Sequence, residues 1–246
     1  MDTVKLQKYF TDCGILSRRA AEAEIENGRV TVNGEVAYLG MRIDPSVDSV
    51  VYKGKEIRPR QDQKICVMLN KPRGFVTTLS DEKGRRTVSQ LVENVGRRLY
   101  PIGRLDMDSD GLLLLTDDGD LANRLTHPKH EIPKIYRVTV DGEVSSKTLE
   151  ELRSPMIIDG YEILPVKTDI VKNEKGGTVL EMRLFEGRNR QIRKMCSQVG
   201  LKIKRLSRIA IGDLLLGDLE VGKWRMLTDR ELDYLRGKNS IPSEEN

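Results

Sequence analysis

The sequence contains few of the residues that build several common kinds of site. Its 246 residues include only three cysteines, Cys13, Cys66 and Cys196, an odd number placed far apart. This spacing supports neither a disulfide framework nor a zinc knuckle, so we expect a reducing, cytoplasmic location. The only two histidines, His127 and His130, have a proline between them and no third ligand nearby in the sequence, so no metal site is expected there.

Long apolar runs are also missing. No stretch approaches the roughly 18 uncharged apolar residues that a membrane helix needs. The N-terminal segment MDTVKLQKYF carries Asp2, Lys5 and Lys8 where a signal peptide has an apolar run, so we expect neither secretion nor membrane insertion. Charged residues make up 33% of the chain, but 38% apolar residues suffice for a core. One or two folded domains are expected.

The net charge of +4 conceals a strong separation of charge along the chain. Residues 181–208 carry 9 basic and 2 acidic side chains, and residues 67–104 carry 8 and 3, whereas residues 105–121 carry 6 acidic side chains and no basic one. Such clustering is typical of a surface that binds a polyanion. It is also typical of a solvated helix face, and charge alone does not separate the two interpretations.

Residues 1–60 are predicted to form a small domain of two helices and hairpins. Apolar residues recur at helical spacing before Gly14, and Ser17 is a plausible N-cap for a second helix. Asn33-Gly34 and Lys53-Gly54 are typical hairpin turns. The run Arg58–Lys64 has no apolar residue, which indicates a linker to a second domain.

Residues 65–237 are predicted to form an α+β domain around a mixed, largely antiparallel sheet. Helices are indicated by capping boxes at Thr87 and Thr228, and by the segment Arg188–Val199 before Gly200. Hairpin turns such as Asp159-Gly160 connect the strands. Residues 238–246 are expected to be a disordered tail. The predicted strands are ICVML, LLLLT, IYRVTV, YEILPV, TVLEMRLF and IKRLSRIAIG.

The acidic segment Gly103–Gly119 has the strongest chemical signal, and three interpretations of it are open. Asp106, Asp108 and Asp110 alternate as in a calcium-binding EF-hand loop, but an apolar run, Leu112–Leu115, follows where that loop has polar ligands. Two of the acids could act as the carboxylate pair of a glycosidase, although sugar-binding aromatics are scarce. Most of the acids could simply form turns and helix caps.

Five motifs in order resemble one family. GRLD, with LLLLTDDG after it, together with KPRGF, YPIGRLD, THPKHEIPKIYRV and EGRNRQIRKM, resembles the signature of the RsuA/RluB family of ribosomal RNA pseudouridine synthases. Residues 1–60, with SRRAAEAEIENGRVTVNG, resemble the α-L, or S-four-type, RNA-binding module that commonly precedes that catalytic domain. The resemblance covers most of the chain and implies an S-four-type domain over residues 1–60 and a catalytic domain over residues 65–237.

The resemblance implies a catalytic set of Asp106, Tyr136 and Arg193. Asp106 is the family's essential carboxylate, which attacks the base, attacks the ribose or transfers protons. Arg193 is the cation that keeps it ionised, and Tyr136 packs on the target base. Arg104 is expected to fill the gap left by the flipped nucleotide. Further RNA contacts are expected from the basic residues Arg18, Arg19, Lys71, Arg188, Arg190 and Lys194.

The expected activity is the isomerisation of one uridine in ribosomal RNA, more in keeping with the large-subunit (23S) than the small-subunit (16S) branch because of Asn189-Arg190. The reaction involves no net oxidation and no energy input, so no cofactor is expected. We expect a monomer whose partner is ribosomal RNA, as a stem-loop or a precursor ribosomal particle. A non-enzymatic ribosome-assembly factor and a glycoside hydrolase are the alternatives from other classes.

Overall fold

A computed structural model describes residues 3–59, 63–130 and 132–238. The chain divides into two compact units. The first contains residues 1–64 with Gly96–Arg98 and Asp117–Gly119, and the second contains the remainder. Of the predicted tail, residues 239–246 lie outside the described residues, as do residues 60–62 of the predicted linker. None of the described helices is long and apolar enough to cross a membrane.

The first unit packs two helices against short antiparallel strands. Ser17 caps the second helix as predicted, with its hydroxyl accepting a hydrogen bond from the amide of Ala20 at 3.2 Å. The Asn33-Gly34 turn has positive φ at both residues, 52° and 87°, as a two-residue hairpin requires. The elements are β1 (Val4–Lys5), α1 (Leu6–Asp12), α2 (Arg18–Glu26), β2 (Val30–Val32), β3 (Glu35–Val36), β4 (Arg42–Ile43), β5 (Val50–Tyr52) and β6 (Lys55–Ile57).

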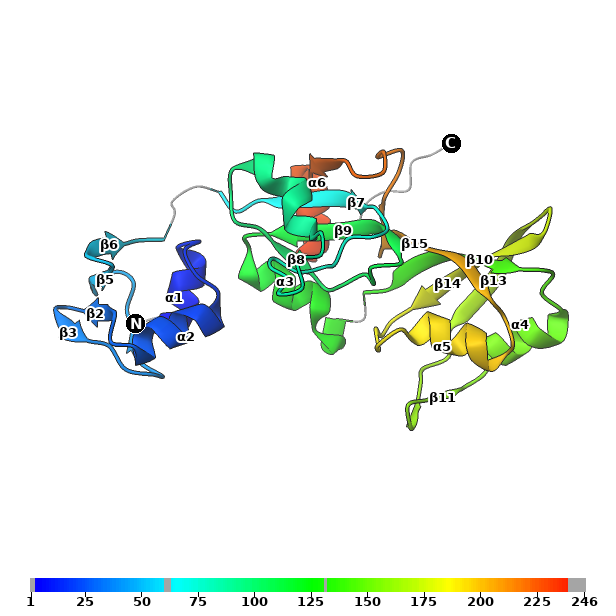
Figure 1. Ribbon diagram of the computed structural model, residues 1–246, viewed down its shortest axis with the longest axis horizontal. Helices are drawn as coiled ribbons and strands as arrows, with labels where there is room; N and C mark the ends of the chain where they lie inside the picture. Colours follow the sequence, from blue (N-terminus) through cyan, green and yellow to red (C-terminus); the bar gives the residue numbers. More distant parts are fainter. Residues whose placement is uncertain (1–2, 60–62, 131, 239–246) are drawn as a thin grey trace. The chain divides into compact units, whose positions relative to one another are not determined.

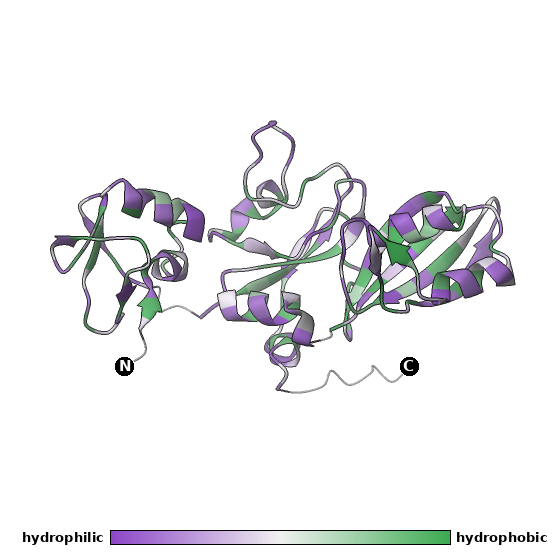
Figure 2. Cartoon of the chain, turned by 90° about the horizontal axis from the view of Figure 1, so that it is seen from below, coloured by the Kyte–Doolittle hydropathy of each residue, from purple (hydrophilic) through white to green (hydrophobic). Residues whose placement is uncertain are grey.

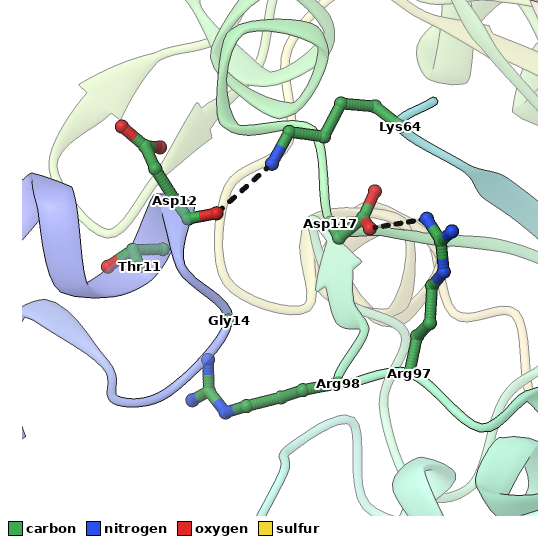
Figure 3. Close-up of a pocket in the computed structure, with 7 residues that line it drawn as sticks. All are labelled: Thr11, Asp12, Gly14, Lys64, Arg97, Arg98 and Asp117. Atoms are coloured by element: carbon green, nitrogen blue, oxygen red, sulfur yellow. Dashed lines mark hydrogen bonds and ion pairs between the residues drawn. The ribbon is translucent and has the colours of Figure 1, made fainter. Parts of the chain in front are cut away.

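A small polar pocket belongs to this unit (Figure 3). The Lys64 ammonium group donates to the carbonyl oxygen of Asp12 at 3.4 Å, and Arg97 forms an ion pair with Asp117 at 3.3 Å. The pocket contains none of the residues predicted to act on RNA. It is lined by Thr11, Asp12, Gly14, Lys64, Arg97, Arg98 and Asp117.

A large mixed sheet forms the centre of the second unit (Figure 1), in the order β13-β14-β10-β15-β9-β7-β17. Every described pairing in it is antiparallel except that between β9 and β15. This confirms the predicted α+β class. Its strands are β7 (Cys66–Lys71), β8 (Tyr100–Ile102), β9 (Asp110–Thr116), β10 (Lys134–Asp141), β13 (Lys167–Glu174), β14 (Gly177–Leu184), β15 (Ile203–Ile211), β16 (Leu214–Leu215) and β17 (Trp224–Met226).

The four-leucine run lies in β9, which is covered on both faces. Leu112 and Leu114 join the apolar cluster on one face, while Leu113 and Leu115 join the cluster on the other. All four side chains are fully buried. A strand buried on both faces needs a continuous apolar sequence rather than an alternating one, which explains LLLLT. Figure 2 shows the apolar residues concentrated in the strands and the polar residues on the outer faces of the helices.

The helices cover the sheet and complete its cores. Leu121 of α3 and Leu232 of α6 join the cluster that contains Leu112, whereas Leu152 of α4 and Met195 of α5 pack with strands β10 and β14. Short 3₁₀ helices occur at Val88–Val95 and Pro128–His130, and a small hairpin, β11 (Ile157–Ile158) with β12 (Tyr161–Glu162), stands apart from the sheet. The helices are α3 (Gly119–Thr126), α4 (Ser146–Arg153), α5 (Gln191–Gln198) and α6 (Asp229–Leu235).

Three local predictions differ from the structure. The helix expected over Arg188–Val199 begins only at Gln191, because Arg190 has a left-handed backbone conformation with φ of 52°. The strand expected over YEILPV is limited to Tyr161–Glu162. Strand β13 was not predicted, because its eight residues are mostly exposed and lack an alternating pattern.

Gly111 is required where β9 pairs with β15. It has φ of +104°, and a Cβ atom placed there would lie 2.2 Å from the carbonyl oxygen of Arg208. Arg208 is its partner in the parallel pairing, and Lys71 is its partner on β7. A side chain at position 111 would therefore separate two strands as well as strain the backbone.

We expect Gly111→Ala to lower the free energy of unfolding by more than about 3 kcal/mol, because strain and a backbone clash add together. Gly142→Ala is the matched control, since Gly142 has φ of +72° but no atom within 4 Å of its added Cβ. That control should cost only the strain, about 1–2 kcal/mol. If chemical denaturation gave the same decrease in the free energy of unfolding for both variants, the close backbone contact at Gly111 would contribute nothing to stability.

Candidate active site

The loop that carries Asp106, between β8 and β9, is held by its backbone. Each of its five successive carbonyl oxygens, from residue 105 to residue 109, accepts a hydrogen bond from a group outside the loop. The donors and acceptors are Thr77 Oγ1 to Leu105 O (2.6 Å), Lys71 Nζ to Asp106 O (3.0 Å), Gly74 N to Met107 O (2.7 Å), Arg193 Nη2 to Asp108 O (3.2 Å) and Lys71 Nζ to Ser109 O (2.9 Å).

Lys71, at the end of β7, lies beneath this loop and has no exposed surface. Its ammonium group donates to three carbonyl oxygens, those of Pro72, Asp106 and Ser109. Burial lowers the pKa of Lys71 to about 8, although the nearby carboxylates of Asp110, Asp106 and Asp108 oppose that shift. The prediction that Lys71 contacts RNA is therefore wrong, because its charge is fully buried and its three donors are used inside the protein.

Two arginines of the α5 region face two carboxylates of the loop. Arg193 Nε lies 3.7 Å from Asp106 Oδ2, and Arg193 Nη2 lies 3.2 Å from Asp108 Oδ1. Arg190 Nη1 lies 3.3 Å from both Asp106 Oδ2 and Asp108 Oδ1. The four side chains thus form a network of two negative and two positive charges.

The two arginines differ in their surroundings. Arg193 has only 16% of its side chain exposed and also donates to the hydroxyl of Ser109 at 3.1 Å, whereas 44% of the Arg190 side chain is exposed. Partial burial would raise the pKa of Asp108, but the hydrogen bond from Arg190 and the charge of Arg193 outweigh it and lower that pKa. The two arginines therefore favour the ionised form of Asp108.

Asp110 differs from the other two acids of the alternating set. Its side chain is 6% exposed and forms an ion pair with Arg205, with Nε to Oδ2 at 3.1 Å. Asp110 is therefore not one of the acids that form turns or helix caps, because it is the first residue of the buried strand β9. In the described part of the chain, no three His, Cys, Asp or Glu side chains are grouped so as to hold a metal ion.

Strand register brings Tyr136 to the same site. Tyr136 on β10 pairs with Arg208 on β15, which in turn pairs with Gly111 on β9. The half-buried Tyr136 ring thus lies two strands from the end of the Asp106 loop. A pocket in the second unit is lined by Arg104, Leu105, Asp106, Ser109, Tyr136, Leu184, Glu186, Gly187, Arg188, Arg190, Gln191, Ile192 and Leu206.

The remaining predicted RNA contacts are distributed over three places. Arg104 and Arg188 are exposed and line the pocket, and Lys194 forms an ion pair with Asp159 on the β11–β12 hairpin. Arg18 and Arg19 are exposed in the first turn of α2, in the first unit. The pocket therefore contains Arg104, Asp106, Tyr136, Arg188 and Arg190, and Arg193 joins it through its pairing with Asp106.

Several residues of the site were not predicted from the sequence. Asp108 shares both arginines with Asp106, and Thr77 and Ser109 hold the loop and Arg193 by hydrogen bonds. Lys71 was expected to contact RNA, but its place at the end of the strand CVMLNK was a signal of burial, since every residue of that strand is buried. A lysine at the end of such a strand needs buried acceptors, which only the tertiary structure supplies.

Comparison with known proteins agrees with this geometry. The model of the RNA pseudouridylate synthase family matches residues 65–198. An uncharacterized RNA pseudouridine synthase of Aquifex aeolicus is 41% identical over 96% of this chain and 94% of its own length. The ribosomal large subunit pseudouridine synthase B of Bacillus subtilis is 37% identical over 96% of this chain and 99% of its own.

The similarity extends to three-dimensional structure. A crystal structure of a pseudouridylate synthase superposes with a TM-score of 0.67 and 31% identity, covering 94% of this chain and 99% of that one. The fold and this family match define an RNA-modifying isomerase. The chain belongs to the RNA pseudouridylate synthase family, and the reaction of that family is the isomerisation of uridine to pseudouridine.

We expect Lys71→Met to lower the free energy of unfolding by about 3–5 kcal/mol at pH 7, because three buried carbonyl oxygens lose their donor. The difference in the free energy of unfolding between parent and variant should widen as the pH rises from 8 towards 10.5. In that range the native Lys71 has released its proton while the unfolded chain still binds one, so the parent gains stability with pH.

Chemical denaturation of parent and variant at pH 7, 8, 9 and 10 measures both effects. Lys147→Met is the control, since 87% of the Lys147 side chain is exposed. A difference that stays constant over this range would contradict the lowered pKa of Lys71.

Proposed function

We propose that the protein isomerises one uridine of ribosomal RNA, and that this RNA belongs to the large subunit. The similarity to the large-subunit synthase of Bacillus subtilis over nearly both full lengths supports this proposal, as does the Asn189-Arg190 motif. The small-subunit RNA is the alternative. We further propose that the enzyme works as a cytoplasmic monomer on a stem-loop or a precursor ribosomal particle.

The observation that carries the proposal is the Asp106 carboxylate, which lines a pocket beside Tyr136 and lies near two arginines. Isomerisation breaks the bond between ribose C1′ and the base nitrogen N1, turns the detached uracil and joins its carbon C5 to C1′. The proton that C5 loses is balanced by the proton that N1 gains, so the atoms and electrons of the nucleotide are unchanged. We assign the direct action on the nucleotide to Asp106, as nucleophile or as proton acceptor. The exchange needs no oxidant, so we propose no cofactor.

We assign supporting roles to the residues around Asp106. Arg193, with only 16% of its side chain exposed, is the cation that compensates the charge of Asp106 when RNA displaces water from the pocket. Tyr136 packs on the target base, and Arg104 occupies the space that the flipped nucleotide leaves in the RNA. Arg190, the more exposed of the two arginines, is able to exchange its carboxylate partners for a phosphate group when RNA arrives.

The surface around the pocket is proposed to bind the RNA backbone. Arg188 and Lys194 supply positive charge beside the pocket, on the basic stretch of residues 181–208. The first unit is proposed to be an S-four-type docking module that contacts RNA through Arg18 and Arg19. Residues 65–237 are proposed as the catalytic domain.

We expect Asp106→Asn to fold, to bind RNA about as tightly as the parent, and to form no detectable pseudouridine. The amide keeps the shape of the side chain but can neither attack nor accept a proton. Asp108→Asn is the matched control on the same loop and should lose no more than about tenfold in rate. The measurement is pseudouridine formed in single-turnover reactions on ribosomal RNA that lacks the modification. Substantial isomerisation by Asp106→Asn would overturn the assignment.

Arg193→Met should lower turnover much more than affinity, because Asp106 and Asp108 lose the less exposed of their two cations. Lys202→Met, at an exposed position in the same basic stretch, should weaken binding without changing turnover. Arg193→Lys should restore part of the rate, since it returns the charge. Equal losses of affinity in the two methionine variants, with turnover preserved, would argue against the pairing with Asp106.

Replacing both Arg18 and Arg19 with glutamine should weaken RNA binding and reduce its dependence on salt, because two phosphate contacts are lost. Turnover at saturating RNA should be unchanged, since these residues act only in docking. Lys147→Gln on the exposed face of α4 is the control. Binding titrations at two salt concentrations test the idea, and unchanged affinity in the double variant would refute docking through this helix.

A further inference from the structure

A second aromatic side chain stands near the pocket, on the β11–β12 hairpin. Tyr161 is 61% exposed, although the chain has only 11 aromatic residues in total. It belongs to the second unit, as does the pocket. Neither the core of this unit nor the proposed catalytic set uses this ring, so its exposure calls for an explanation.

The hairpin is held in a fixed position beside α5. Asp159 and Gly160 form its turn with φ of 53° and 80°. Lys194 of α5 forms an ion pair with Asp159, and Gln198 Nε2 donates to the carbonyl oxygen of Ile157 at 3.2 Å. Figure 1 shows the hairpin next to α5. Tyr161 is therefore presented by an anchored element.

Arg188 links the Tyr161 ring to the pocket. Its guanidinium carbon lies 4.7 Å from the centroid of the ring, and its Nε lies 3.2 Å from Glu186 Oε2. Glu186 also accepts hydrogen bonds from the amide of Leu164 and from the side chain of Gln191, both at 3.1 Å. Because Arg188 and Glu186 line the pocket that contains Asp106, the ring and the pocket share one wall.

The chemistry of this surface matches an unpaired nucleotide. Proteins that bind single-stranded RNA stack bases on aromatic rings and on guanidinium planes, and neutralise the neighbouring phosphates with basic side chains. Tyr161 and Arg188 supply the first pair of groups, and Arg190 and Lys194 supply positive charge close by. A guanidinium group against the exposed ring, with Arg190 lining the pocket and Lys194 paired to Asp159 of the same hairpin, suits an anionic nucleic acid better than an apolar protein partner.

We propose that Tyr161 and Arg188 form a stacking platform for an unpaired base adjacent to the target uridine. This inference rests on the proposed function, because the occupant is part of the same RNA. The platform positions the substrate and takes no part in the bond changes. It contributes to the choice of uridine, since only a target with an unpaired neighbour gains the stacking contact.

The test uses the full-length protein and a ribosomal RNA fragment that the parent modifies. Tyr161→Ala should weaken binding by about five- to a hundredfold, while single-turnover rates at saturating RNA stay at the parent value. Tyr161→Trp should restore binding, since it returns a stacking surface. Ile157→Ala is the matched control, because Ile157 is 64% exposed on the same hairpin, and it should bind like the parent.

A series of fragments, each with one unpaired nucleotide made abasic, identifies the stacked base. At one abasic position, the affinity of the parent should fall as far as the affinity of Tyr161→Ala falls on the intact fragment. The parent and Tyr161→Ala should then bind this abasic fragment equally. A loss that persists for every abasic fragment, an equal loss in Ile157→Ala, or no loss in Tyr161→Ala would overturn the platform. Failure of the parent to modify any ribosomal RNA would instead contradict the proposed function.

Discussion

The active site depends on a lysine that never reaches its surface. The Lys71 ammonium group donates to the carbonyl oxygens of Asp106 and Ser109, and so fixes the middle and the C-terminal end of the loop that carries Asp106 and Asp108. Three donors meet three carbonyl oxygens, which is the full capacity of an ammonium group. Because the pocket, the ion pairs and the start of β9 all follow from the path of this loop, they depend on that one buried charge.

The electrostatics of the site follow from the fixed loop. Asp106 and Asp108 form ion pairs with two arginines of the α5 region, of which Arg193 is 16% and Arg190 44% exposed. We propose that the less exposed arginine stays paired when RNA excludes water and that the more exposed one binds phosphate. The two arginines differ in backbone setting as well, because Arg193 lies within α5 whereas Arg190 precedes its first residue in a left-handed conformation.

Local features were predictable from the sequence, and tertiary ones were not. Turns such as Asn33-Gly34, the Ser17 cap and the four-leucine strand are set by neighbouring residues, and the structure has them where predicted. The sequence did not indicate the carbonyl partners of the buried Lys71 or the pairing of Arg190 with Asp106, because a charge in a basic stretch gives no sign of its tertiary partners. Their partners lie 35 and 84 residues away in the chain, and only the folded sheet brings them together.

The most direct test of the central claim is a map of pseudouridine in ribosomal RNA at single-nucleotide resolution. Cells that lack this protein should retain one unmodified uridine, in the large-subunit RNA. The parent gene should restore the modification, and a gene encoding the Asp106→Asn chain should not. An unchanged map in the deletion strain, or full restoration by the Asp106→Asn chain, would contradict the account. A missing modification in the small-subunit RNA would contradict the choice of subunit.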